Sequence, residues 1–131
     1  MATRSNIGIQ GADGKIKAIY CHWDGYPSGV GATLAEHYTD LAKVEALMDL
    51  GDFSSLMENV EEIKSYAELG ATDTEARLFD TVQDWIEYAL SQDAEFIYLF
   101  EYDPYSGWGW NYYALGSHWV SLPSTKQVAN A

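Results

Sequence analysis

The chain has 131 residues, 47% of them hydrophobic, which suffices for one core in a single domain spanning residues 1–131. Its 20 acidic residues outnumber seven lysines and arginines, and a formal net charge of −13 disfavours direct binding to nucleic acid or anionic membranes. Because no apolar run approaches the roughly 20 residues that cross a bilayer, and no secretory signal is present, we expect a protein of the cytoplasm.

The negative charge is concentrated in the middle of the sequence. Residues 36–103 hold 18 acidic side chains against Lys43, Lys64 and Arg77, whereas both ends are near neutral or slightly basic. A field of this sign steers basic protein surfaces toward the chain. The alternative interpretation is a solvated acidic face that only keeps the protein soluble.

The first predicted element is a β-hairpin. Residues 5–10 and 15–22 are rich in strand-forming residues and flank Gly11-Ala-Asp-Gly14, whose Asp-Gly pair suits a tight reversal. Cys21, the single cysteine, lies near the end of the second strand. We interpret it as a small buried side chain without a chemical role.

A loop and two short helices are predicted next. Residues 23–31 contain three glycines and a proline, which favour a loop. A helical spacing of apolar residues begins at Ala32 and stops at Gly51, with a break at residues 39–40. The Asp40 side chain can cap the second helix. Residues 52–71 fit no element clearly.

The clearest helical pattern covers residues 72–90. Thr72 and Glu75 fit a capping box, and an apolar stripe follows from Leu78 to Leu90. Three acids are predicted on the side opposite this stripe, namely Asp80, Asp84 and Glu87. We expect them to face solvent, where a partner could reach them.

Strands are predicted for the rest of the chain. Residues 96–100 are apolar on both faces, as in a central strand, and the Pro-Gly-containing segment 103–107 suits a turn. Residues 108–115 and 118–122 follow as two more antiparallel strands. The predicted fold is therefore an α+β domain, with an antiparallel sheet of about five strands and helices packed on one face.

The segment 22–29 is a candidate binding loop. Loops carry function, and this one holds two large rings where a plain connection would use small polar residues. Trp23 and Tyr26 are the candidate contact groups, with Asp24 between them. The alternative is that both rings fold back over the edge of the core while Asp24 hydrogen-bonds its own turn.

Motifs in and around this loop resemble a known family. The run Ile19-Tyr-Cys-His-Trp-Asp-Gly-Tyr-Pro-Ser-Gly-Val-Gly31, followed by Leu34-x-x-His37-Tyr38 and Leu50-Gly-Asp-Phe-Ser-Ser-Leu56, is similar to a family of small proteins found in phages and prophages. The similarity also touches Glu95-Phe-Ile-Tyr-Leu-Phe100 and Trp108. It implies a phage accessory setting, in which many small acidic proteins block host defences, and it transfers no catalytic residue.

Aromatic residues near the C-terminus form a second candidate site. Trp108, Trp110 and Tyr112 share one face of a predicted strand, and Trp119 lies on the next strand. Packing between strands and against helices is one interpretation of this set. Rings that are exposed would instead form a hot spot for a protein partner or a stacking platform for a base.

No catalytic or metal-binding constellation is predicted. His22, Asp24, His37 and His118 are potential metal ligands, but none of them has the spacing of a coordinating pair. Cys21 and His22 are adjacent on a strand, so their side chains point to opposite faces and make a poor nucleophile–base pair. We therefore expect no cofactor, no metal and no enzymatic activity.

The leading hypothesis is a non-enzymatic, phage-type protein that binds and inhibits a basic host defence or nucleic-acid-handling protein, its acidic surface partly mimicking a nucleic-acid backbone. The predicted contact residues are Trp23, Asp24, Tyr26, Trp108, Trp110, Asp80, Asp84 and Glu87. The second hypothesis is an oligomeric nucleotide-binding protein that sequesters a host immune signalling nucleotide between aromatic rings. An enzyme is the third.

Overall fold

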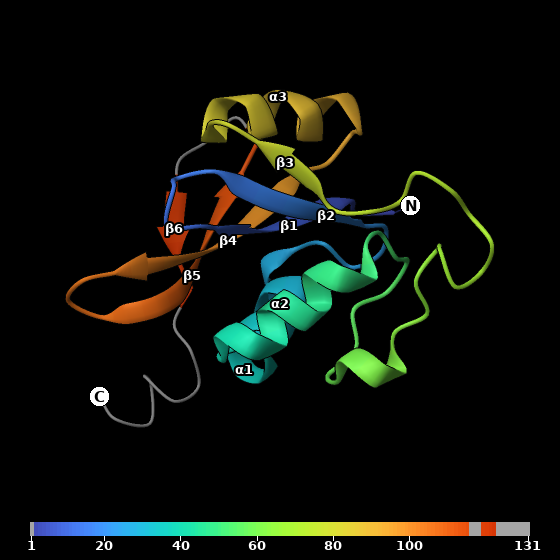
Figure 1. Ribbon diagram of the computed structural model, residues 1–131, viewed down its shortest axis with the longest axis horizontal. Coiled ribbons are helices and arrows are strands. Elements are labelled where there is room, and N and C mark those ends of the chain that lie inside the picture. The colour runs from blue at the N-terminus through green and yellow to red at the C-terminus, as the bar shows by residue number, and fades with distance from the viewer. Residues whose placement is uncertain (1, 116–118, 123–131) are drawn as a thin grey trace.

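Six strands form one sheet in the computed structural model, which describes residues 2–115 and 119–122 (Figure 1). In chain order they are β1 (Ser5–Gln10), β2 (Ile16–Cys21), β3 (Arg77–Phe79), β4 (Phe96–Asp103), β5 (Gly107–Ala114) and β6 (Trp119–Ser121). The helices are α1 (Ala32–His37), α2 (Leu41–Leu50) and α3 (Val82–Ser91), with a π-helical turn η1 (Pro27–Gly31) and a 3-10 turn η2 (Val60–Glu62). None of the helices in the described ranges has the length and apolarity to cross a membrane. The predicted α+β class is confirmed.

The N-terminal hairpin forms as predicted. β1 and β2 pair antiparallel along their whole length. A 2.9 Å hydrogen bond from the Gly11 N–H to the Lys15 carbonyl closes the turn between them. Gly14 adopts a φ of 83°, which a residue without Cβ reaches freely, so the Asp-Gly pair does reverse the chain here.

A parallel pair joins this hairpin to the C-terminal strands. The sheet order is β3-β2-β1-β4-β5-β6; β1 runs parallel to β4, and the other pairs are antiparallel. The prediction of about five antiparallel strands is thus corrected at two points, the added edge strand β3 and the parallel β1–β4 pair. A parallel pairing needs a long connection, and the chain between β2 and β4 supplies one that contains all three α-helices of the described ranges.

Helices cover both faces of the sheet, which corrects the prediction that they pack on one face (Figure 1). α1 and α2 cover the face that carries Tyr98 and Phe100. α3 covers the face that carries Ile97 and Leu99, and its Trp85 is fully buried there. The physical reason lies in β4, whose residues alternate between the two faces and are apolar on both, so each face needs a cover.

The segment before α3 is a strand, so the predicted capping box is wrong. Residues 77–79 pair with β2 at the sheet edge, and α3 begins after Thr81, whose hydroxyl accepts the Asp84 N–H at 3.1 Å. Thr72 and Glu75 cap no helix, because Asp73 between them adopts a φ of 58°, outside the right-handed helical region.

The chain from Gly51 to the start of β3 is tied to β2. Gly51 ends α2 with a φ of 73°, as predicted, whereas the Asp40 side chain makes no capping hydrogen bond, contrary to expectation. The Asp52 carboxylate accepts the Tyr20 N–H at 2.8 Å, and the Phe53 N–H donates to the Tyr20 carbonyl at 3.0 Å. These bonds, rather than a helix, fix the start of the stretch that fitted no element from sequence.

Candidate binding surfaces

The residues singled out from the sequence lie at three separate places. Trp23, Asp24 and Tyr26 follow β2 at the end of the sheet where β4 begins. Trp108 pairs with Tyr102 toward the other end of β4, which at about 3.3 Å per residue puts the two aromatic groups about 20 Å apart along the sheet. The predicted acids, Asp80, Asp84 and Glu87, belong to α3 and the turn before it. The predicted contact residues therefore do not form one surface.

Close backbone contacts hold the loop that carries Trp23. The Gly25 N–H donates to the Thr3 carbonyl at 2.9 Å, and the Gly25 carbonyl accepts the Tyr98 hydroxyl at 2.6 Å. A Cβ on Gly25 would lie 2.6 Å from the Thr3 carbonyl oxygen, and a Cβ on Gly29 would lie 2.4 Å from the Asp24 carbonyl oxygen. Both glycines are therefore required by close packing, and the side chains between them are held in place.

Trp23 and Tyr26 project from this loop, with exposed fractions of 45% and 41%, so neither ring is buried over the edge of the core. The Tyr26 hydroxyl donates to the Asp24 carboxylate at 3.1 Å, and this hydrogen bond raises the pKa of Tyr26. The cavity beside the rings measures about 180 Å³, below the roughly 300–1,000 Å³ of small-molecule sites. The loop therefore suits contact with another surface better than enclosure of a ligand.

The β4–β5 hairpin carries the second aromatic group and extends beyond the helices (Figure 1). Trp108 stacks on Phe100, with ring centroids 5.1 Å apart and planes at 11°, and meets Tyr102 edge-on at 5.8 Å. Tyr102 is 60% exposed, and Tyr105 in the turn is 99% exposed. The hairpin thus presents rings to solvent, one of them already held by stacking.

Trp110 belongs to the core, which corrects its prediction as a surface contact. It is 4% exposed, and its indole N–H donates to the Tyr38 carbonyl at 2.8 Å. Trp108 and Trp110 share a strand face, so alternation alone cannot distinguish them. The two tryptophans differ in exposure because the end of α1 covers Trp110, while Trp108 lies farther along the hairpin.

A cavity of about 610 Å³ lies beside this hairpin, and we call it the hairpin cavity. Its wall includes Thr39 from the α1–α2 connection, four rings and two carboxylates: Phe100, Tyr102, Trp108, Trp110, Glu101 and Asp103. Gly109 and Gly107 pair with Glu101 and Asp103, and a Cβ on either glycine would meet no atom within 4 Å. The glycines leave this part of the hairpin open, and no Lys or Arg is among the described residues of the wall.

Four residues of the hairpin were not predicted from the sequence as contact groups, namely Tyr102, Tyr105, Glu101 and Asp103. A signal for them was present, because the predicted turn at 103–107 places its flanking side chains at a hairpin tip, where few neighbours can cover them. The abundance of tryptophan in the next strand instead favoured Trp110, which is buried, over the exposed tyrosines beside the turn.

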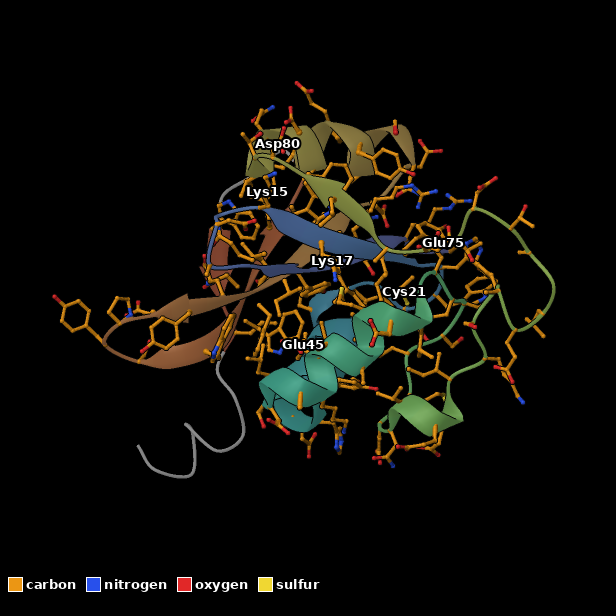
Figure 2. The ribbon with its side chains drawn as sticks, in the orientation of Figure 1. Lys15, Lys17, Cys21, Glu45, Glu75 and Asp80 are labelled. Carbon is orange, nitrogen blue, oxygen red and sulfur yellow. The ribbon has the colours of Figure 1, made fainter. Side chains whose placement is uncertain are left out.

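The predicted acids of the α3 region are exposed, but one of them has a partner. Asp80 lies 3.7 Å from the Lys15 ammonium nitrogen, and the two residues are labelled next to each other in Figure 2. Asp84 and Glu87 are exposed on α3 itself. This region is acidic, yet it lies on the opposite side of the sheet from the hairpin rings that pack with α1 and α2.

A denser acidic surface lies on α1, α2 and η2, which pack on the same side of the sheet as those rings. Figure 1 shows α1 and α2 on the side of the sheet opposite α3. Residues 36–62 contain one cation of the Lys/Arg type, Lys43, whose ammonium donates to the Glu58 carbonyl at 2.7 Å. Seven exposed carboxylates accompany it, and we call them the acidic layer: Glu36, Asp40, Glu45, Asp49, Glu58, Glu61 and Glu62. Thr39, beside Asp40, lines the hairpin cavity, so the layer and the cavity adjoin.

The buried thiol has no activating neighbour among the described residues. Burial raises the pKa of Cys21 to about 12, so the thiol stays neutral and is a poor nucleophile near neutral pH. His22 forms a 2.7 Å hydrogen bond with the Tyr20 hydroxyl through Nδ1 and packs edge-on against Trp23. Over residues 2–115 and 119–122, no three His, Cys, Asp or Glu side chains gather as a metal site, and His118 lies outside those ranges.

The resemblance of residues 19–31 to a phage family depends on sequence motifs. In the structure, close packing accounts for the glycines of this motif at positions 25 and 29, and the rings of Trp23 and Tyr26 are exposed. No protein-family model, curated protein or solved structure matches the chain, so the resemblance stays a prediction.

Proposed function

We propose that this chain is a non-catalytic binding protein that docks onto a positively charged surface of another protein. The observation that carries the proposal is the hairpin cavity, whose wall combines the exposed Tyr102, the half-buried Trp108 and two carboxylates, beside the acidic layer. Aromatic anchors supply contact area, and complementary charge speeds encounter and sets specificity. In the form that we favour, the chain is a phage-type inhibitor and its partner is a nucleic-acid-handling host protein.

Most of the negative charge has no cationic partner within the described part of the chain. Of the 18 carboxylates in residues 36–103, 16 are exposed, and among the described contacts only Glu68 and Asp80 of those 16 lie within 4.0 Å of a lysine nitrogen. Surface ion pairs contribute at most about 1 kcal/mol each, and unpaired like charges repel one another. The exposed carboxylates therefore contribute little to the stability of the fold, and their role in our proposal is to attract a basic partner.

A protein partner suits the cavities better than a nucleotide does. Glu101 and Asp103 line the larger cavity and Asp24 the smaller, and no Lys or Arg is among the described residues of either wall. Phosphate groups are bound by cationic side chains or clustered N–H donors, and carboxylates repel them. The rings could stack on a base, but the carboxylates of the cavity walls would repel the phosphate groups of a nucleotide.

The test measures binding of the chain to a panel of purified bacterial DNA-binding proteins by biolayer interferometry at increasing NaCl, with and without duplex DNA. We expect binding to at least one of them, a steep loss of affinity with salt, and competition by the duplex. Glu45→Gln with Asp49→Asn removes two charges from α2, and Asp84→Asn with Glu87→Gln is the matched control on α3. Salt-insensitive binding, or equal effects of the two variants, would contradict the mimicry.

A further inference from the structure

The structure also suggests what the hairpin cavity holds. We propose that it takes an arginine-containing, extended segment of the protein partner, an inference that rests on the proposed function. At about 610 Å³ the cavity falls within the roughly 300–1,000 Å³ of ligand sites, so it can accept a few side chains.

The cavity adjoins the outer edge of β5. β6 pairs with residues 111–113 of β5, and the Leu122 N–H donates to the Trp110 carbonyl at 3.0 Å. Gly107 and Gly109 at this edge carry no side chains that would block an approach, and a Cβ on either would meet no atom within 4 Å. An extended segment can therefore lie along the hairpin, between side chains that alternate to the two faces of β4 and β5.

The face of the β4–β5 hairpin that carries Phe100, Tyr102 and Trp108 offers a stacking surface. Phe100 supports one side of the Trp108 ring system, and the exposed Tyr102 stands at its edge. A planar guanidinium stacks on such rings, and tryptophan is the strongest cation–π partner among the aromatic residues. The compact, strongly hydrated ammonium of lysine gains less from stacking, which favours arginine.

The opposite face of the hairpin carries negative charge, because Glu101 and Asp103 alternate along β4 with Phe100 and Tyr102. Asn111 donates its amide N–H to the Glu101 carboxylate, and the Tyr105 N–H donates to Oδ1 of Asp103 at 2.7 Å. Neither carboxylate has a cationic partner among the described residues. Their remaining oxygens can accept the paired N–H donors of a second guanidinium, from a neighbouring arginine of the extended segment whose side chain points to this face.

The test uses two capped peptides of equal charge, hexaarginine and hexalysine, titrated into the full chain at low salt while intrinsic tryptophan fluorescence is followed. We expect hexaarginine to bind several-fold more tightly than hexalysine. Glu101→Gln with Asp103→Asn keeps hydrogen-bonding groups in place, and removing two ion pairs at the surface should weaken hexaarginine about tenfold. The matched control, Glu87→Gln with Asp84→Asn, removes the same charges from α3 and should weaken it less than about twofold.

Each other result has a defined meaning. Equal losses in the two double variants would refute the cavity as the arginine site while leaving the docking proposal intact. Equal affinities for the two peptides would refute the choice of arginine. No binding of either peptide to the parent chain would overturn the inference, and the salt titration with DNA-binding proteins would then decide separately whether the proposed function also fails.

Discussion

Replacing Gly8 with alanine tests whether α3 packs on the second face of the sheet. Gly8 lies on β1, and a Cβ there would be 2.9 Å from Cη2 and 3.0 Å from Cζ2 of Trp85. Both atoms belong to the six-membered part of the indole and have no counterpart in phenylalanine. Gly8→Ala should therefore destabilise the parent chain and do so far less when Trp85 is replaced by phenylalanine.

The magnitudes follow from packing and hydrogen bonding. Overpacking against a fixed ring costs about 1–3 kcal/mol, and the lost freedom of the unfolded chain offsets roughly 0.5–1 kcal/mol, so Gly8→Ala should cost about 1–2 kcal/mol. Trp85→Phe removes the indole N–H that donates to Oδ1 of Asn6 at 3.1 Å, which together with lost ring contacts should cost about 2–4 kcal/mol. The Ile16 methyl, 3.2 Å from the added Cβ, leaves a residual cost in the double variant.

Urea unfolding followed by far-UV circular dichroism measures the free energy of unfolding of the parent, the two single variants and the double variant. We expect the double variant to be more stable than the sum of the single effects predicts, by about 1 kcal/mol, because neighbouring substitutions couple. Gly14→Ala is the control, since this turn glycine has open space around it and a positive φ, so its loss of stability should be the same with Trp85 or phenylalanine in α3. Strict additivity at Gly8 and Trp85 would refute the packing of α3 on this face.

Three further predictions concern buried and closely packed groups. Cys21, with its pKa raised to about 12, should resist thiol reagents at pH 8 in the native chain and react once urea unfolds it. Desolvation raises the folded-state pKa of Asp52 despite the nearby Arg77. The protonated carboxyl therefore stabilises the fold at a pH below its ordinary pKa, and this stabilisation is lost as the pH rises through the folded-state pKa. When urea unfolding is measured at pH 3 and pH 7, the stability of Asp52→Asn relative to the parent should be greater at pH 7. Gly25→Ala should shift the loop and change Trp23 emission, since its Cβ would meet a backbone oxygen at 2.6 Å.

Local patterns in the sequence predicted the elements whose signals are local. The Asp-Gly turn, the stop at Gly51 and the apolar run of β4 each depend on a few neighbouring residues, and each is present in the structure. The start of α3 was misplaced because residues 77–79 fit both a helical stripe and a short edge strand. Their pairing with β2, distant in sequence, decides between the two.

The candidate sites were predictable only in part, because exposure depends on which elements cover a strand. Trp23 and Tyr26 were found from their loop, where a large ring is unusual. Trp110 and Trp108 have the same periodicity and differ only in their distance from α1. The acidic layer was visible as a charge excess, but its place beside the hairpin cavity required the packing of α1 and α2 on that face.

The position of the hairpin bears on the proposed docking role of its exposed rings. A single exposed aromatic residue is ordinary on a protein surface, whereas a gathered apolar patch marks an interaction site. Trp108 packs against the core on the α1–α2 face, whereas Tyr102 and Tyr105 nearer the tip are 60% and 99% exposed. A stable fold would be obtained with small polar residues at such a tip. These exposed tyrosines are the groups that the proposed protein partner would cover.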